Sequence, residues 1–231
     1  MTTTTTVTTV TTITTNQVPP TKARLIFVLD RSGSMQSIQN EAIGGFNAFV
    51  EAQKKVEGEA TLSLIIFDNI IDTIHKDVPL NEVPILTNQV FIPRGMTAMN
   101  DAIGVTITQC LSETAEVGVK TIMAVLTDGQ ENSSKEFTGK MVGDLIKRAE
   151  SEYGWEVLFL GANIDVNAVA SSINVSSNKF ATFEATAKGA MDSYDAFSNV
   201  TSMYRSGASG QSVNLSAELT KSADLSSQKS K

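Results

Sequence analysis

The 231-residue sequence contains very few of the cysteine and histidine residues that many metal centres and hydrolytic sites use. It has one cysteine, Cys110, and one histidine, His75. A single cysteine excludes an intrachain disulfide and a cysteine-rich zinc site. A single histidine argues against most histidine-based metal sites and against Ser-His-Asp chemistry. No apolar run approaches the roughly 18 residues of a membrane-spanning helix, so we expect no membrane insertion.

Positive charge is also scarce. Lysine and arginine total 18 against 25 acidic residues, which gives a net charge of −7. Nucleic acids and anionic membrane surfaces require a basic face, so this balance argues against both as partners. The hydrophobic fraction of 41% and the chain length suffice for an apolar core that needs no metal or disulfide to fold.

The two ends differ in composition from the middle. Residues 1–21 include eleven threonines among the first fifteen positions and lack the charged and apolar regions of a signal peptide. We interpret them as a disordered or partner-ordered tail. Residues 206–231 hold eight serines and no aromatic residue. This composition offers too little apolar surface to offset the entropy of ordering, so we predict a flexible tail after a single domain at 22–205.

Within 22–205, strand-like apolar runs alternate with helical periodicity. Continuous apolar runs predict strands buried on both faces, and apolar residues spaced three and four apart predict helices. The predicted strands are 23–29, 60–67, 70–75, 121–126, 155–160 and 179–183, and the predicted helices are 35–53, 99–111, 137–150, 166–172 and 187–204. This alternation predicts an α/β fold with a mainly parallel, doubly wound sheet, one antiparallel hairpin strand and helices on both faces.

Polar side chains follow the predicted strands at the points where ligands bind in such sheets. Asp30, Ser32 and Ser34 come directly after the first strand, Asp128 follows the 121–126 strand, and Thr97 precedes a helix. Side chains at alternate positions of a strand-to-helix loop converge on one point, and Gly33 allows the backbone to turn there. A serine-rich helix N-cap would explain the first loop equally well. The three loops together favour a site for a cation.

Carboxylates and hydroxyls are hard oxygen ligands, which suit Mg²⁺, and also Mn²⁺ or Ca²⁺, rather than zinc or copper. Two carboxylates and neutral hydroxyls leave a divalent ion electrophilic, and the adjacent helix N-terminus favours a further anionic ligand. We therefore expect the ion to keep an open coordination position for an Asp or Glu side chain of another protein.

Three stretches, FVLDRSGSM, PRGMTAMNDAIG and VLTDGQEN, resemble the metal-ion-dependent adhesion site (MIDAS) of von Willebrand factor A (VWA) domains. They are most similar to short stand-alone bacterial and phage VWA proteins, some of them grouped with tellurium-resistance genes. The resemblance covers residues 22–205 and implies a Rossmann-like sheet of six strands with one antiparallel edge. It also implies that Ser32, Ser34 and Thr97 coordinate the ion, while Asp128 and often Asp30 act through water. Gly95-Met96 stands where many members have two glycines.

Further residues are expected around this site. Asp101 lies one helical turn after Thr97 and is either a carboxylate that orients the site or one placed at a helix N-terminus by the helix dipole. Asp68 and Asn69 read as a hairpin turn rather than a metal pair. Residues expected at the rim are Gly129, Arg94, Met96, Glu131 and Asn132.

The favoured function is a non-enzymatic, metal-dependent protein-binding module. The sequence has no P-loop, no G-x-G-x-x-G after a strand and no G-x-S-x-G elbow. An assembly role, for example in a phage particle or a stress-response complex, with the metal mainly stabilising the fold, stays open. A phosphohydrolase with Asp30 as nucleophile is less favoured, because position 32 is serine instead of a second acidic ligand. We expect a cytoplasmic protein, or a virion protein if the chain is of phage origin; the sequence leaves the oligomeric state open.

Overall fold

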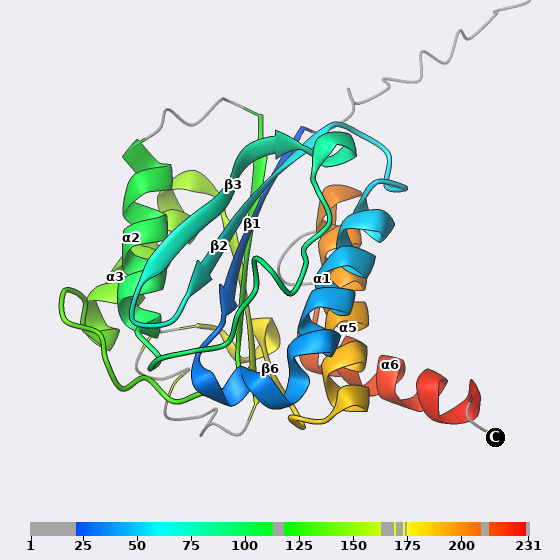
Figure 1. Cartoon of the computed structure of the whole chain (residues 1–231). Coiled ribbons are helices and arrows are strands. Elements are labelled where there is room, and N and C mark those ends of the chain that lie inside the picture. The colour runs from blue at the N-terminus through cyan, green and yellow to red at the C-terminus, as the bar shows by residue number, and fades with distance from the viewer. Residues whose placement is uncertain are drawn as a thin grey trace, which may run out of the picture.

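The computed structural model describes residues 22–112, 118–162, 169, 173, 175–208 and 213–229. Six strands form one sheet in the order β3-β2-β1-β4-β5-β6 (Figure 1). The strands are β1 (Ala23–Asp30), β2 (Ala60–Phe67), β3 (Ile71–Pro79), β4 (Lys120–Thr127), β5 (Glu156–Ala162) and β6 (Phe180–Phe183). Only β3 pairs antiparallel to its neighbour, at one edge. The predicted α/β fold class is confirmed.

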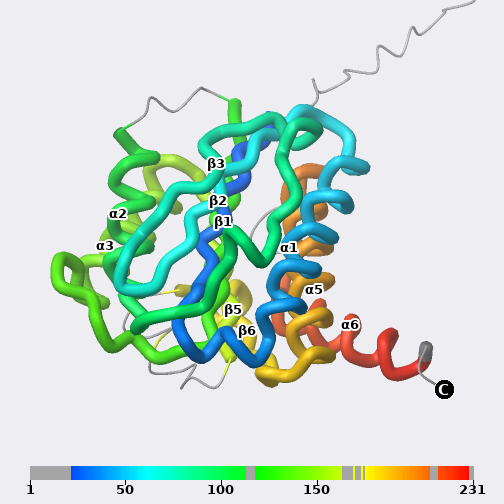
Figure 2. Tube along the Cα trace, in the orientation of Figure 1, coloured from blue at the N-terminus to red at the C-terminus, as the bar shows by residue number. Residues whose placement is uncertain are grey.

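Helices cover both faces of the sheet. The α-helices are α1 (Gln39–Gln53), α2 (Met99–Ser112), α3 (Gly139–Tyr153), α5 (Ala187–Arg205) and α6 (Leu215–Lys229). Helices α1 and α5 pack on one face, and α2 and α3 lie on the other (Figures 1 and 2). Two buried apolar clusters, one beneath each pair of helices, therefore sandwich the sheet. The central strands are apolar on both sides, which is why they appear in the sequence as unbroken apolar runs.

The first predicted helix is divided in two. Residues Gly33–Ile38 form a 3₁₀ helix, and α1 begins only at Gln39. Three residues per turn place Met35 and Ile38 on one side, and both are buried. This tight turn leads the chain from the end of β1 into the helical layer. Of the predicted helix at 166–172, only residue 169 lies within the described residues. The predicted tail at 1–21 lies wholly outside them.

The prediction of a flexible tail at 206–231 is wrong for most of that segment. Residues Leu215–Lys229 form α6, which packs against α5 and β6. Val213 and Leu215 are buried, and the Ser216 hydroxyl donates to the carbonyl of Phe180 over 2.8 Å. A few apolar residues suffice here because α5 and β6 already present a surface for them to cover. The domain therefore extends beyond residue 205.

The edge strand β3 is longer than predicted and ends at Pro79 instead of His75. Its pairing with β2 shifts register twice around Leu64, so it bends away from a flat edge. In the part of the chain that the structure describes, no helix combines the length and the apolar character needed to cross a lipid bilayer.

Two adjacent glycines in α1 provide a test of the contact between α1 and α5. A Cβ at Gly45 would lie 2.1 Å from Cδ2 of Tyr194, whereas a Cβ at Gly44 would meet nothing within 4 Å. We expect Gly45→Ala to lower the free energy of unfolding by about 1–3 kcal/mol through overpacking. Gly44→Ala should raise it by up to about 1 kcal/mol through helix propensity. Urea denaturation of both variants checks this, and equal effects of the two substitutions would contradict the packing described.

Candidate functional site

The candidate site lies where the strand order reverses. Strands β1 and β4 are hydrogen-bonded neighbours, with Leu29 opposite Leu126. The chain leaves β1 toward β2 on one side and leaves β4 toward β5 on the other. Diverging connections of this kind leave a crevice at the carboxyl edge of a parallel sheet. Asp30 and Asp128, at the ends of these two strands, therefore face the same crevice.

Asp30 is the most deeply buried of the predicted metal ligands, with none of its surface exposed. One carboxylate oxygen accepts the backbone N–H of Ser32 at 2.6 Å, and the other accepts the hydroxyl of Thr127 at 2.5 Å. Sequence reasoning did not single out Thr127, because a threonine at the end of a strand is common. These two bonds fix the orientation of the carboxylate toward the loops.

The hydroxyl residues predicted as ligands are brought together around Gly129. The Ser32 and Ser34 hydroxyl oxygens are 3.1 Å apart, and the Ser34 hydroxyl donates to Asp128 over 2.6 Å. A Cβ built on Gly129 would lie 2.8 Å from the Thr97 hydroxyl oxygen, 3.4 Å from that of Ser34 and 3.5 Å from that of Ser32. Three hydroxyl oxygens from two separate loops thus surround one point that only a glycine at position 129 leaves open. We call Ser32, Ser34 and Thr97 the hydroxyl cluster.

Burial is the largest influence on the pKa values of the Asp30 and Asp128 carboxylates. Burial raises the pKa of Asp30 to about 6, although the hydrogen bonds from Thr127 and Ser32 oppose the rise. Burial also raises the pKa of Asp128, against the hydrogen bond from Ser34. No cationic side chain contributes to either shift. A bound cation would supply the positive charge that the surrounding side chains do not provide.

The loop carrying Thr97 is held against the loop after β4. The Thr97 N–H donates to the side-chain oxygen of Asn132 over 2.9 Å, and the Asn132 N–H donates back to the Thr97 carbonyl over 3.0 Å. Glu131 accepts the N–H of Asn100 at 2.8 Å, close to the start of α2. Glu131 and Asn132 therefore shape the site by joining two loops.

Asp101 lies in the first turn of α2, as the helix-dipole interpretation predicts, and its carboxylate also holds a neighbouring loop. Its carboxylate accepts three backbone N–H groups, those of Lys135, Glu136 and Phe137, at 2.7–2.9 Å. These bonds fix the loop before α3, and none of them reaches the hydroxyl cluster. The sequence gives no signal for this contact because the partners are backbone groups more than 30 residues away.

Asp68 is a hairpin residue, as predicted, and also the centre of an ionic cluster that sequence reasoning missed. Its carboxylate is fully buried and accepts the Ile70 N–H at 2.6 Å, which forms the turn. The same carboxylate pairs with Arg31 at 3.1 Å and Arg94 at 2.8 Å. Arg31 also pairs with Asp72 at 2.5 Å. We call Arg31, Asp68, Asp72 and Arg94 the ionic cluster.

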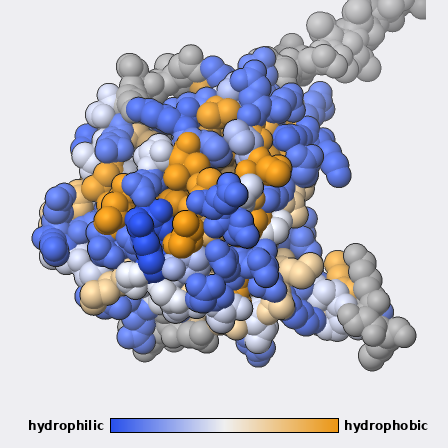
Figure 3. Space-filling model, in the orientation of Figure 1, coloured by the Kyte–Doolittle hydropathy of each residue, from blue (hydrophilic) through white to orange (hydrophobic). Residues whose placement is uncertain are grey.

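The stretch of chain that leads to Thr97 carries exposed apolar side chains. In the described residues, five of the nine exposed large apolar side chains belong to the stretch between positions 70 and 96: Ile70, Ile85, Val90, Ile92 and Met96. Figure 3 shows an apolar area on the face that carries β3. Met96, predicted at the rim, is 51% exposed, and the side chain of Arg94 is 52% exposed. The surroundings of Thr97 therefore combine exposed apolar side chains with a half-exposed cation.

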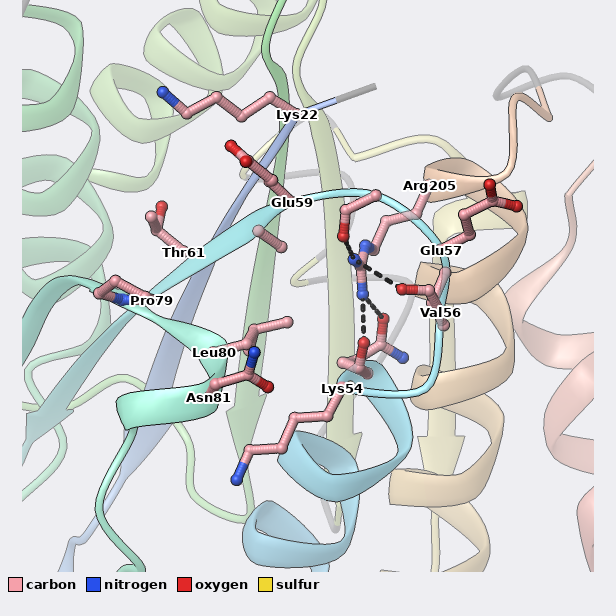
Figure 4. A pocket seen from close by; sticks show the side chains of 13 residues that line it. Lys22, Lys54, Val56, Glu57, Glu59, Thr61, Pro79, Leu80, Asn81 and Arg205 are labelled. Atoms are coloured by element: carbon pink, nitrogen blue, oxygen red, sulfur yellow. Dashed lines mark hydrogen bonds between the residues drawn. The ribbon is translucent and has the colours of Figure 1, made fainter. Parts of the chain in front are cut away.

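Two grooves lie away from this site. One, of about 700 Å³, is at the amino-terminal edge of the sheet between Lys22, Glu59 and Leu80 (Figure 4). Arg205 lines it and donates to the carbonyls of Gln53 and Gly58, so its guanidinium joins backbone segments. The other, of about 360 Å³, lies between α1 and α5. Neither is lined by Ser32, Ser34 or Thr97.

Within the described ranges, no three side chains of the His, Cys, Asp and Glu types gather in one place. A cation at the carboxyl edge would therefore be bound by two carboxylates and by hydroxyls. The residues present fit a hard divalent ion, because every candidate donor is an oxygen atom.

The fold is that of VWA domains. One similar structure is proximal thread matrix protein 1 (PTMP1) from the mussel byssus, at 16% identity and a TM-score of 0.58 over 79% of this chain and 46% of that one. Another is a von Willebrand factor type A protein from Catenulispora acidiphila, at 10% identity and a TM-score of 0.58 over 79% and 43%. This chain thus spans less than half the length of either.

A third similar structure is the von Willebrand factor domain of the type V pili tip protein Mfa5 from Porphyromonas gingivalis. It is 12% identical with a TM-score of 0.58, over 80% of this chain and 96% of that one. A further structure of the mussel protein has a zinc-occupied MIDAS motif. No protein-family model matches the sequence, and no curated protein matches it either. At these identities the likeness establishes the fold.

The pKa of Asp30 predicts how the metal-free protein responds to pH. The folded-state pKa of about 6 exceeds the ordinary value of 3.8, so the folded protein holds a proton that the unfolded chain releases. The stability that the folded protein has with Asp30 protonated is fully present below pH 3.8 and is lost as the pH rises through about 6.

We expect the free energy of unfolding in chelator to fall by about 1 kcal/mol more in the wild type than in Asp30→Asn between pH 5 and pH 7. Urea denaturation at the two pH values measures the difference. Parallel pH dependence in the two proteins would show that the Asp30 carboxyl is not held in an unfavourable environment.

Proposed function

We propose that this domain is a non-enzymatic protein-binding module that binds a divalent cation at the carboxyl edge of its sheet. Ser32, Ser34 and Thr97 would hold the ion through their hydroxyls, with Asp30 and Asp128 directly or through water. The observation that carries the proposal is the convergence of three hydroxyl oxygens within 3.5 Å of the open position at Gly129. The VWA fold supports it, because the loops that match the MIDAS motif meet at this edge.

Mg²⁺ is the ion we propose, with Mn²⁺ and Ca²⁺ as alternatives. All the donors are oxygen atoms, which such ions prefer. Zinc is also considered as the bound ion, because the mussel protein's MIDAS motif is zinc-occupied in one structure. When bound, the ion supplies an electrophilic centre, since two carboxylates are the only anions around it. The chain's own residues hold the ion and leave one side of it open.

An acidic side chain of a partner protein fits the remaining position. Ser34 is exposed and donates to Asp128, which is only 5% exposed, so a side chain from another molecule can approach at Ser34. Exposed apolar residues such as Met96 stand beside it, and large apolar side chains are typical contacts between proteins. An exposed apolar side chain beside Thr97 therefore favours a protein partner.

A mainly structural role for the ion is the second candidate. The observation in its favour is that Asp30 is buried and that no cationic side chain lowers its pKa, because an ion there would stabilise the fold in any case. The placement among stand-alone VWA proteins of the tellurium-resistance type is a proposal that rests on the sequence motifs, and a cytoplasmic or virion location is a further proposal.

Metal-dependent melting tests the proposed site. Mg²⁺ at a hundredfold excess over its Kd stabilises the folded state by about 2.7 kcal/mol, which for a domain of this size is a rise in Tm of about 5–10 °C. Asp30→Ala should abolish the rise, and so should Gly129→Ala, whose methyl group would stand 2.8 Å from the Thr97 hydroxyl oxygen. Zn²⁺, Mn²⁺ and Ca²⁺ are measured alongside.

Asp144→Ala is the matched control, because Asp144 is an exposed carboxylate paired only with Lys140 on α3. It should retain the full metal-dependent rise. If neither Mg²⁺ nor chelator moves the Tm of the wild type, the proposed cation site is wrong.

A phosphatase assay separates the binding module from an enzyme. We expect no turnover of a generic phosphate ester by the Mg²⁺-loaded protein. Turnover that Asp30→Asn abolishes and Asp144→Asn preserves would establish a phosphohydrolase and contradict the non-enzymatic proposal.

A further inference from the structure

We propose that Arg94 is a positioning residue that holds the Thr97 loop in the geometry needed for cation binding. This inference rests on the proposed function, because it concerns the same cation site. Arg94 acts through the ionic cluster and touches no proposed ligand side chain in any bond described above. Its role would be to keep the Thr97 hydroxyl beside those of Ser32 and Ser34.

Asp68 is the fixed point of the cluster. Its carboxylate is fully buried in the hairpin between β2 and β3 and is compensated by the two arginines and the Ile70 N–H. Arg31, which is 5% exposed, follows Asp30 directly in the chain. The cluster therefore links the end of β1, the β2–β3 hairpin and the loop before α2 at one place.

Both ends of the Thr97 loop are attached to Asp68. Arg94 reaches the Asp68 carboxylate with its side chain at 2.8 Å, and the Ala98 N–H donates to the Asp68 carbonyl at 2.9 Å. The Arg94 N–H also donates to the carbonyl of Arg31 at 2.8 Å. Thr97 stands between these attachments, which fix its position together with its two hydrogen bonds to Asn132.

Gly95 makes the close approach possible. Its φ is +68°, and a Cβ there would lie 2.2 Å from the side-chain oxygen of Asn69. The Gly33 N–H donates to the Gly95 carbonyl at 3.3 Å, which brings the serine loop against the Thr97 loop. The hairpin and the serine loop thus both contact the Thr97 loop at Gly95. The half-exposed Arg94 side chain joins the Thr97 loop to the hairpin at Asp68.

Loss of Arg94 should affect the loop rather than the whole fold. The Arg94 side chain is half-exposed, so its pair with the buried Asp68 carboxylate is only partly removed from water. The Asp68 carboxylate would keep Arg31 and the Ile70 N–H as partners, so no buried charge would be left alone. The attachment at Ala98 would remain, and the other end of the loop would be tethered through its backbone alone.

The test compares Arg94→Gln, Arg94→Lys and the control Arg148→Gln, in which an exposed arginine paired with Glu152 is altered on α3. Mg²⁺ and Mn²⁺ affinities are measured by titration calorimetry well below the melting temperature. The Tm and the amide hydrogen exchange are measured in chelator. We expect Arg94→Gln to weaken metal affinity about tenfold or more. Its metal-free Tm should stay near that of the wild type, with faster exchange confined to residues 94–98.

Arg94→Lys should recover part of the affinity, because it keeps the charge but loses the planar guanidinium. Arg148→Gln should change neither affinity nor exchange at 94–98. Unchanged affinity and exchange in Arg94→Gln would overturn the proposal, and so would a large fall in the metal-free Tm with normal affinity, which marks a purely structural role. Failure of the wild type to bind any ion contradicts the proposed function instead, and exchange at 94–98 in the metal-free protein then decides whether Arg94 positions the loop.

Discussion

The burial of the Asp30 carboxylate at the end of the central strand is the constraint on which the rest of the site depends. A carboxylate with none of its surface exposed, and with no cationic side chain lowering its pKa, is unfavourable in its charged form, and burial raises its pKa to about 6. The Ser32 N–H and the Thr127 hydroxyl compensate only in part. The surrounding loops supply oxygen donors instead of positive charge. This combination is expected where a cation completes the charge balance.

The topology explains why these groups meet. Strands β1 and β4 are adjacent but their connections diverge, so the loops that follow them flank one crevice. The Thr97 loop reaches the same place from the β2–β3 side, held by Asn132 on one flank and by the ionic cluster on the other. The glycine at 129 then keeps the centre free of side chains.

The sequence was informative wherever the signal is local. Unbroken apolar runs predicted the central strands, and Asp30 and Asp128 fall at one edge because parallel strands end together. The sequence was misleading where a segment is ordered by contacts with residues far away in the chain. The segment containing α6 has few apolar residues, and it is ordered by contacts with α5 and β6 that composition does not reveal. The pairing of Asp68 with Arg31 and Arg94 spans 37 and 26 residues and has no motif.

The most direct measurement is the anomalous scattering of a crystal grown with Mn²⁺. The account predicts one anomalous peak at the carboxyl edge of the sheet, beside the open side of Gly129, with the hydroxyls of Ser32, Ser34 and Thr97 directed at it. Its remaining coordination positions should carry water or an acidic side chain from a neighbouring molecule. Ordered crystals with no peak there at saturating Mn²⁺, or a peak held by other residues, would contradict the central claim.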